Sequence, residues 1–196
     1  EVETVKHYKM LRKRGIPTLI FVNKMDKEGV NFDEVLDDIR TKLSKKCIPF
    51  SRPIGHEEGF DGFINVVDLK ARKYNGKECV DDVIHDDKKE IVLEYHNEIM
   101  EQVALTDDAL LEKFFSGETL TMDEIHTGLR KGVLNGDLTP VLVGSATNNI
   151  GVHTLLNMIL SYMPSPEDLK PYVGVDKAGN EIEKKTSIDQ PFSAYV

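Results

Sequence analysis

The sequence is poor in cysteine and contains no long apolar run. The two cysteines among its 196 residues, Cys47 and Cys79, form no C-x-x-C pair, so no cysteine-based metal or disulfide framework is indicated. We expect buried thiols in a cytoplasmic protein. Because no apolar run approaches the length that spans a bilayer, we expect no membrane association.

An excess of positive charge is also lacking. Lys and Arg number 25 against 34 Asp and Glu, which gives a formal net charge of −9. Phosphate backbones attract Lys and Arg, so an acidic surface is a poor docking site for bare nucleic acid, and we expect contacts with protein instead. With 40% hydrophobic residues, the chain is long enough to bury one substantial core.

Motifs for hydrolytic and metal chemistry are absent as well. His56-Glu57-Glu58 lacks the second histidine of H-E-x-x-H, and Ser145 has no histidine partner at a recognisable spacing. The phosphate loop G-x-x-x-x-G-K-[S/T], whose backbone and lysine hold phosphates and whose hydroxyl binds Mg²⁺, does not occur. We therefore assign no catalytic residue and no metal ligand within the chain.

A polar tetrapeptide, N-K-M-D at residues 23–26, directly follows the apolar run 18–22. The carboxylate of Asp26 matches two adjacent donors of guanine, N1–H and the N2 amino group, and adenine lacks that pair. Asn23 offers a donor and an acceptor to the N7/O6 edge, while Lys24 can lay its aliphatic stem along the base face. The alternative is a polar turn in which Asp26 caps a helix.

A second strand-like run, P-V-L-V-G-S-A at residues 140–146, ends in small residues far downstream. Ser145 offers a hydroxyl, and Ala146 is expected to offer a free backbone N–H aimed at O6 of guanine. That N–H accepts guanine and opposes the amino group of adenine. N-K-x-D alone is a weak pattern, but together with a downstream strand that ends in G-S-A it predicts guanine recognition.

Segments along nearly the whole chain resemble elongation factor G, a family of translational GTPases. The resemblance implies that GTP or GDP binds at Asn23, Lys24, Asp26, Ser145 and Ala146. It also implies a parent protein that hydrolyses GTP and promotes translocation of tRNA and mRNA on the ribosome. The segments are V-N-K-M-D-K-E-G-V-N-F (22–32), I-G-H-E-E-G-F-D-G (54–62), V-D-L-K-A-R-K-Y (67–74), L-L-E-K-F-F-S-G-E-T-L-T-M-D-E-I (110–125), V-G-S-A-T-N-N-I-G-V (143–152) and Y-M-P-S-P (162–166).

Two positions depart from the family pattern. Thr147 stands where a larger apolar residue is common, and Tyr74 where an aromatic residue, often tryptophan, is common. They leave open a divergent paralogue or a ribosomal protection protein with the same G domain. Another alternative, of a different class, is a non-hydrolysing ribosome-interaction module that keeps the nucleotide motifs as relics.

In the family, the phosphate loop, the D-x-x-G switch and the catalytic histidine precede N-K-x-D. The matches to D-x-x-G at 26–29 and 176–179 cannot serve, because one overlaps N-K-x-D and the other follows the G domain. Since the chain opens on Glu1 within an expected helix, we expect a piece of a longer protein whose N-terminal part holds the Mg²⁺. Without phosphate and magnesium contacts, this chain alone should not hydrolyse GTP and should bind guanine nucleotides poorly.

The expected fold class is α/β, a partial P-loop-GTPase-type parallel sheet with helical crossovers, interrupted by an inserted α+β subdomain. Residues 1–47 and 138–165 would form the guanine-binding part of the G domain, 48–137 the inserted G′ subdomain, and 166–196 a linker and the start of a following β domain. The two polar motifs would then lie at the carboxyl ends of neighbouring strands, where open α/β sheets bind ligands.

Hydrophobic periodicity and turn residues give further expectations for individual elements. A helix with an apolar stripe begins at Phe32, and Thr121 with Glu124 fits a capping box. A small antiparallel sheet is expected over 49–83 and a hairpin tip at Gly179-Asn180. Helices are expected over 88–105, 107–116 and 122–133, a strand over 191–196, and an inner face of the last helix made of Leu155, Leu156, Ile159 and Leu160.

An acidic stripe lies along the helix expected over 88–105. Like charges four residues apart weaken a helix slightly, so the stripe is either a tolerated solvated surface or a docking face for a basic protein. By the resemblance, the inserted subdomain faces the ribosomal stalk protein, and we expect a monomer that meets the ribosome through it. The stripe consists of Glu90, Glu94, Glu98 and Glu101.

Overall fold

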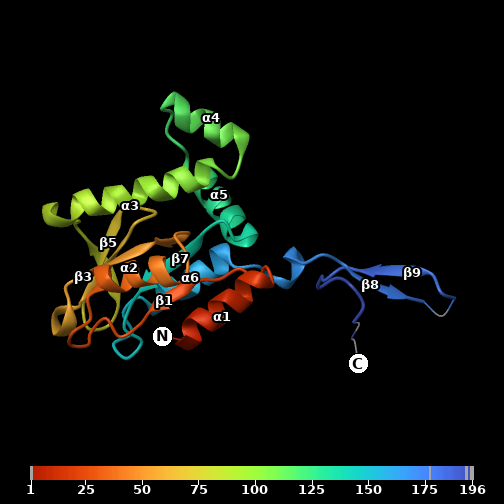
Figure 1. Ribbon diagram of the computed structural model, residues 1–196, viewed down its shortest axis with the longest axis horizontal. Helices are drawn as coiled ribbons and strands as arrows, with labels where there is room; N and C mark the ends of the chain where they lie inside the picture. Colours follow the sequence, from red (N-terminus) through yellow and green to blue (C-terminus); the bar gives the residue numbers. More distant parts are fainter. Residues whose placement is uncertain (1, 177, 193, 195–196) are drawn as a thin grey trace. The chain divides into compact units, whose positions relative to one another are not determined.

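The structure, a computed structural model, describes residues 2–176, 178–192 and 194. It divides into two compact units, Glu1–Met163 and Pro164–Val196, which are described separately (Figure 1). Unit 1 contains a parallel sheet, an antiparallel sheet and all of the α-helices in the described part of the chain. Its mixed α/β architecture is the fold class expected from the sequence.

Three short strands form the parallel sheet: β1 (Ile20–Val22), β7 (Thr139–Val143) and β2 (Cys47–Pro49). Their order is β1-β7-β2, with Val22 opposite Val143 in the pairing of β1 with β7. The two motif-bearing strands are therefore neighbours, as predicted. Strand β2 was not expected, because the hydrogen bonds that form it come from β7 and no local pattern reveals them. It also crosses the boundary that the sequence suggested between residues 47 and 48.

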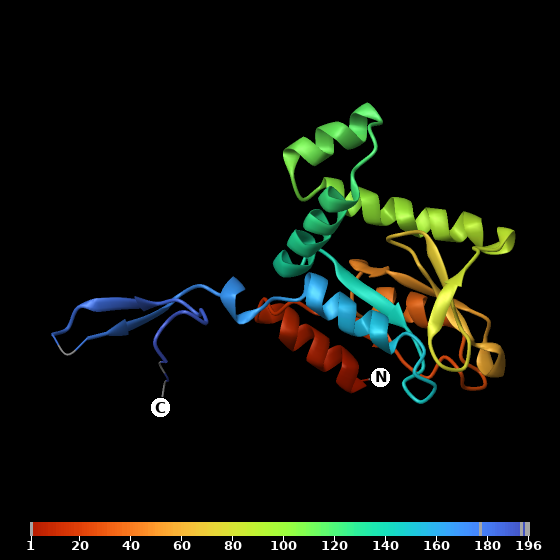
Figure 2. The same ribbon diagram turned by 180° about the vertical axis from the view of Figure 1, so that it is seen from behind.

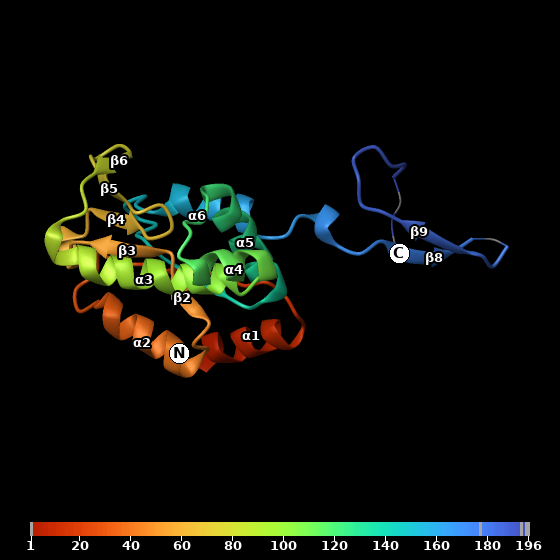
Figure 3. The ribbon, with the colours of Figure 1, turned by 90° about the horizontal axis from the view of Figure 1, so that it is seen from above.

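Helices cover both faces of this sheet. Figure 3 shows α1 (Val2–Lys13) and α2 (Phe32–Lys42) on one side, and α6 (Val152–Tyr162) on the other. The Tyr8 hydroxyl of α1 lies 3.2 Å from the Thr139 hydroxyl, which ties that helix to the start of β7. None of the helices in the described part of the chain combines the length and apolar character needed to cross a bilayer.

Four strands form the expected antiparallel sheet as a simple meander. They are β3 (Ser51–Ile54), β4 (Gly62–Asn65), β5 (Lys70–Tyr74) and β6 (Cys79–Asp82), in sequence order. A short 3₁₀ turn, η1 (Glu57–Gly59), joins β3 to β4.

Three helices follow: α3 (Asp86–Ala104), α4 (Asp108–Ser116) and α5 (Met122–Asn135), close to the predicted ranges. Helix α3 runs along the antiparallel sheet, as seen from behind in Figure 2, and packs Val92 against Ile64 and Ala71. The predicted capping box of α5 is confirmed.

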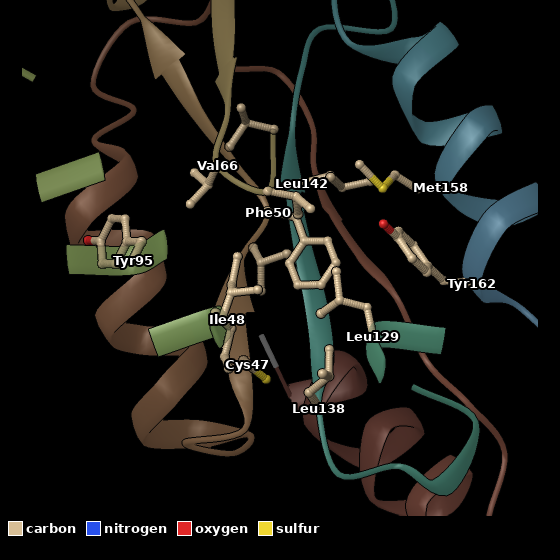
Figure 4. Packing of buried hydrophobic residues seen from close by; sticks show 14 of the residues in the cluster. Cys47, Ile48, Phe50, Val66, Tyr95, Leu129, Leu138, Leu142, Met158 and Tyr162 are labelled. Atoms are coloured by element: carbon tan, nitrogen blue, oxygen red, sulfur yellow. The ribbon is translucent and has the colours of Figure 1, made fainter. Parts of the chain in front are cut away.

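One core joins the parallel sheet to the segment expected as an insert. Figure 4 shows Phe50, which directly follows β2, between Leu142 of β7, Leu129 of α5 and Tyr162 of α6. The Phe50 and Tyr162 rings meet edge to face, with centroids 5.8 Å apart. The segment expected as an insert therefore shares this main core with the parallel sheet, and it adds a smaller cluster of its own around Ile64, Ala71 and Val92.

The predicted inner face of α6 is wrong in part. Met158 and Tyr162 are its buried residues, and Tyr162 is 1% exposed. Leu156 and Ile159 are exposed, and Leu160 is 80% exposed. Because this helix is apolar around most of its circumference, the sequence fits either of two buried faces that differ by a one-residue shift. Packing against Phe50 decides which face is buried.

Unit 2 contains η2 (Pro166–Asp168) and a hairpin of β8 (Tyr172–Val175) and β9 (Glu181–Lys184). Gly179 and Asn180 lie in the connection, as predicted, where Asp176 Oδ1 accepts the Asn180 N–H at 2.8 Å. The strand expected over 191–196 is not found at residues 191, 192 and 194, and its other positions lie outside the described residues.

Candidate functional site

The loops after β1 and β7 are bound to each other at the carboxyl edge of the parallel sheet. Gly144 N donates to Val22 O at 3.0 Å, and Met25 N donates back to Gly144 O at 3.2 Å. Asn23 Oδ1 then accepts the Ala146 N–H at 2.9 Å. The structure thus brings the two predicted motifs together in one place, although they are far apart in the sequence.

Asp26 lies at the centre of this arrangement with a side chain only 10% exposed. The pKa of Asp26 is lowered, chiefly by a hydrogen bond from the Ser145 hydroxyl. Lys27, whose ammonium lies 3.3 Å from the carboxylate, lowers the pKa further, while burial opposes both effects. Its Oδ1 atom is buried and accepts no hydrogen bond from any described residue. A buried carboxylate oxygen normally has a donor, so Oδ1 is an acceptor that suits a ligand N–H.

The alternative role of Asp26 as a helix cap does not hold. The next helix, α2, begins at Phe32, and its N-cap is Asn31, whose Oδ1 accepts the Asp33 N–H at 2.9 Å.

Asn23 uses its side-chain oxygen to hold the loops. Oδ1 accepts two backbone N–H groups, from Lys24 at 2.8 Å and from Ala146 at 2.9 Å. The Ala146 N–H is therefore not free, contrary to the sequence-based expectation. Because both contacts need an oxygen, the orientation of the amide is fixed, and its NH₂ end is the one that faces other partners.

Lys24 adopts a left-handed backbone conformation, with φ of 66°, and its side chain is exposed. Left-handed residues other than glycine are uncommon and concentrate where a loop has a functional shape. The exposed aliphatic stem agrees with the expected role along a base face, although no described contact tests that role.

Gly144 and Ser145 are the tightly packed residues at the start of the loop that follows β7. Ser145 is buried, and its backbone N–H donates to Ile150 O at 3.0 Å. A Cβ on Gly144 would lie 2.4 Å from Ile150 O and 2.6 Å from the Phe21 ring, so only glycine fits. The need for small residues here is thus explained first by the packing of the two loops.

The turn between β3 and β4 contacts the loop that follows β1, which no sequence motif predicted. Glu57 Oε1 accepts the Gly29 N–H at 2.9 Å, three residues after Asp26. Arg52 forms a two-pronged ion pair with Asp33 at 2.7 and 2.9 Å. The sequence signals for this turn were the family-like segment at 54–62 and its glycines, none of which carried an assigned role.

Metal ligands are not grouped in the described part of the chain: no three His, Cys, Asp or Glu side chains lie close enough together to hold an ion. The Mg²⁺ implied by the resemblance would need phosphate-loop residues that this sequence does not contain. The residues present therefore do not fit that ion, and no chemistry is derived through it.

The sheet, its helices and the paired loops define a mixed α/β domain of the translational GTPase type. The sequence pattern of the family described as the elongation factor Tu GTP binding domain matches residues 1–165, and the chain belongs to this family. It is also similar to the crystal structure of ttk003000868 from Thermus thermophilus, with a TM-score of 0.78 and 29% sequence identity. That match covers 93% of this chain but 29% of the other, so the chain spans less than a third of that protein's length.

Proposed function

We propose that this chain binds a guanine nucleotide through the loops that follow β1 and β7. The observation that supports the proposal most directly is Asp26, whose ionised carboxylate is held by Ser145 while its buried Oδ1 accepts no hydrogen bond from a described residue. Guanine brings two adjacent N–H donors to such a group, whereas adenine brings none in that arrangement.

The other loop residues have complementary roles. The NH₂ end of Asn23 suits the N7 acceptor of the base, and the stem of Lys24 covers the base face. The Ala146 N–H is the donor for O6. Because that N–H donates to Asn23 Oδ1 at 2.9 Å, binding requires the bond to be shared with O6 or the asparagine amide to turn.

The parent activity is part of the same proposal. On the basis of the quoted family segments, we infer an elongation-factor-G-like GTPase that acts in ribosomal translocation. Residues 1–47 and 138–165 would then be the base-binding half of its G domain, 48–137 an inserted subdomain, and 166–196 a linker and the beginning of the next domain. A paralogue or a ribosomal protection protein with the same G domain would use the same base-reading loops.

We propose the acidic stripe of α3 as the contact to the ribosomal stalk protein. Glu98 is used within the fold, because its Oε2 accepts a hydrogen bond from Arg40 at 2.6 Å. The docking face is thus reduced to Glu90, Glu94 and Glu101, which are exposed.

The test of nucleotide binding is a titration of this 196-residue chain with GDP and ADP, followed by NMR of the backbone amides. We expect weak binding, on the order of millimolar, because no phosphate loop contributes. GDP should shift the amides of residues 23–29 and 144–147, and ADP at the same concentration should not. Equal shifts with both nucleotides, or none with GDP, would contradict the proposal.

A further inference from the structure

We propose that Glu57 is a positioning residue that sets guanine specificity by holding the base-reading loop, defined here as residues 23–29. This inference rests on the proposed function. It assigns a role in base recognition to a residue of the inserted segment, which lies outside both sequence motifs.

The two halves of the base-reading loop are held differently. In the first half, Asn23 is bonded to Ala146, and the Met25 N–H donates to Gly144 O at 3.2 Å. The Met25 side chain is also buried in the core. This half is therefore fixed by the neighbouring strand and its loop.

The second half, residues 26–29, has few external contacts. Within the loop, Lys27 N donates to Lys24 O at 3.1 Å, and the Lys27 ammonium pairs with Asp26. From outside, the described contacts are the Ser145 hydroxyl on the Asp26 side chain and Glu57 Oε1 on the Gly29 N–H at 2.9 Å. Glu57 therefore makes the hydrogen bond from outside the loop that holds the backbone on the far side of Asp26.

The turn that carries Glu57 is well suited to act as a fixed support. Gly55 has φ of +75°, and a Cβ there would lie 1.8 Å from Gly59 O, so the turn is tightly closed. Phe60 is buried in the main core, and its N–H donates to Glu57 O at 3.0 Å. Glu57 itself has φ of 53°, an uncommon conformation for a side-chain-bearing residue.

The same turn faces Asp26 across a shared hollow. A pocket of about 640 Å³ is lined by Asp26, Lys27 and Glu28 on one side and by the turn 55–59 on the other. The Arg52–Asp33 ion pair ties the preceding strand to the start of α2, just beyond the loop. The inserted segment thus contacts the chain on the C-terminal side of Asp26 at two residues, Gly29 and Asp33.

This geometry has a direct consequence for specificity. A bidentate contact between a carboxylate and two N–H donors is sensitive to the position of the carboxylate. If the loop moves at residue 29, the contact of Asp26 with the two donors of the base is therefore weakened more than the other contacts to the base. The affinity for a base with both donors should fall, whereas the affinity for hypoxanthine, which lacks the 2-amino group, should change little.

The experiment compares GDP with inosine diphosphate in NMR titrations of the 196-residue chain. For Glu57→Ala, we expect the ratio of the two affinities to fall by roughly threefold or more, as expected for the loss of one hydrogen bond to a charged acceptor. Glu57→Gln keeps an acceptor oxygen and should retain most of the ratio. Glu112→Ala on α4 is the control, because Glu112 is exposed and lies outside the pocket that faces Asp26.

The ratio separates positioning from stability, because partial unfolding lowers both affinities by the same factor. Should Glu57→Ala not fold, Glu57→Asp is the second variant. Its shorter side chain keeps the charge but moves the carboxylate away from the Gly29 N–H, so the ratio of the GDP and inosine diphosphate affinities should again fall. An unchanged ratio in Glu57→Ala or Glu57→Asp, or an equal loss in Glu112→Ala, would overturn the positioning role while leaving the proposed function intact. If the wild-type chain itself does not distinguish GDP from inosine diphosphate, the proposed function fails instead.

Discussion

At the scale of single residues, Asp26 acquires its chemistry from its neighbours. The Ser145 hydroxyl, followed by the Asp26 backbone N–H and then Lys27, lowers its pKa, so the carboxylate is ionised at neutral pH and stays so as the pH falls toward that lowered value. Its Oδ1 is buried without a donor from the described residues, which is unfavourable for a charged group. A ligand that brings N–H groups to this atom relieves that cost.

Replacement of Asp26 by asparagine should change the preferred base. The amide offers one acceptor and one donor, which matches xanthine, where a carbonyl replaces the 2-amino group of guanine. We expect Asp26→Asn to bind GDP about tenfold or more weakly and to favour xanthosine diphosphate. NMR titration measures both affinities, and Asp37→Asn, an exposed change on α2, serves as control. A variant that still prefers GDP would show that Asp26 does not read the base.

At the scale of elements, the ends of the helices are defined by local contacts that the sequence already contains. The capping box of α5 joins Thr121 and Glu124, and the Lys113 ammonium of α4 bonds the same carboxylate. The bond from Lys113, followed by the backbone bond from Thr121, lowers the pKa of Glu124 from 4.5 to about 2. One glutamate therefore links the start of α5 to the end of α4.

This link should make stability depend on pH in a defined window. Because the pKa of Glu124 is lower in the folded state, its contribution is complete above pH 4.5 and is lost as the pH falls toward about 2. Glu124→Gln should therefore unfold at a lower temperature than the wild type at neutral pH, and the difference should shrink between pH 4.5 and 2. Thermal unfolding followed by circular dichroism measures this. Glu112→Gln, an exposed change on α4, should show no such trend.

The exposed glutamates of α3 are the residues through which we propose that this helix meets a partner. We expect Glu90→Lys together with Glu94→Lys to weaken binding of the chain to the isolated ribosomal stalk protein, because the charge on one side of the contact is reversed. Biolayer interferometry at low salt measures the affinity. Glu112→Lys reverses a charge on α4 as a control, and equal binding by both variants would argue against the α3 face.

At the scale of the whole molecule, both sheets of unit 1 contribute to its main core. Phe50 lies directly between β2 and β3, is fully buried, and packs edge to face on Tyr162 of α6. Val66 N donates to Phe50 O at 3.0 Å, so the backbone at the same position also joins the antiparallel sheet. Residues 1–47 and 138–163 are thus expected to fold together with residues 48–137.

Truncation at this junction should weaken both parts at once. We expect Phe50→Ala to lower the free energy of unfolding by roughly 3–5 kcal/mol, the usual cost of removing a buried phenyl ring. Urea denaturation followed by circular dichroism and by tyrosine fluorescence should show one transition with both probes. Phe115→Ala, at a site that is 79% exposed, should change stability little. Separate transitions for the two probes would contradict a shared core.

The sequence determined those features that depend on neighbours along the chain. The apolar run before Asn23 and the run before Ser145 are sufficient to predict two parallel strands that end in polar loops, because strand pairing places such ends at one edge. Thr121 and Glu124 predict their own capping box, since both partners lie within one turn. The candidate residues Asn23, Lys24, Asp26, Ser145 and Ala146 likewise follow from the pattern of donors and acceptors that guanine requires, and their role in binding stays a prediction.

The tertiary structure alone decided what depends on partners distant in sequence. Strand β2 has only three residues, so it is recognised as a strand only through its pairing with β7. The inner face of α6 depends on where Phe50 lies, and the Ala146 N–H is occupied because Asn23 lies across from it. The contact of Glu57 with Gly29 follows from the closure of a turn in the inserted segment. Local patterns fix which groups a segment can offer, whereas long-range packing fixes which groups meet.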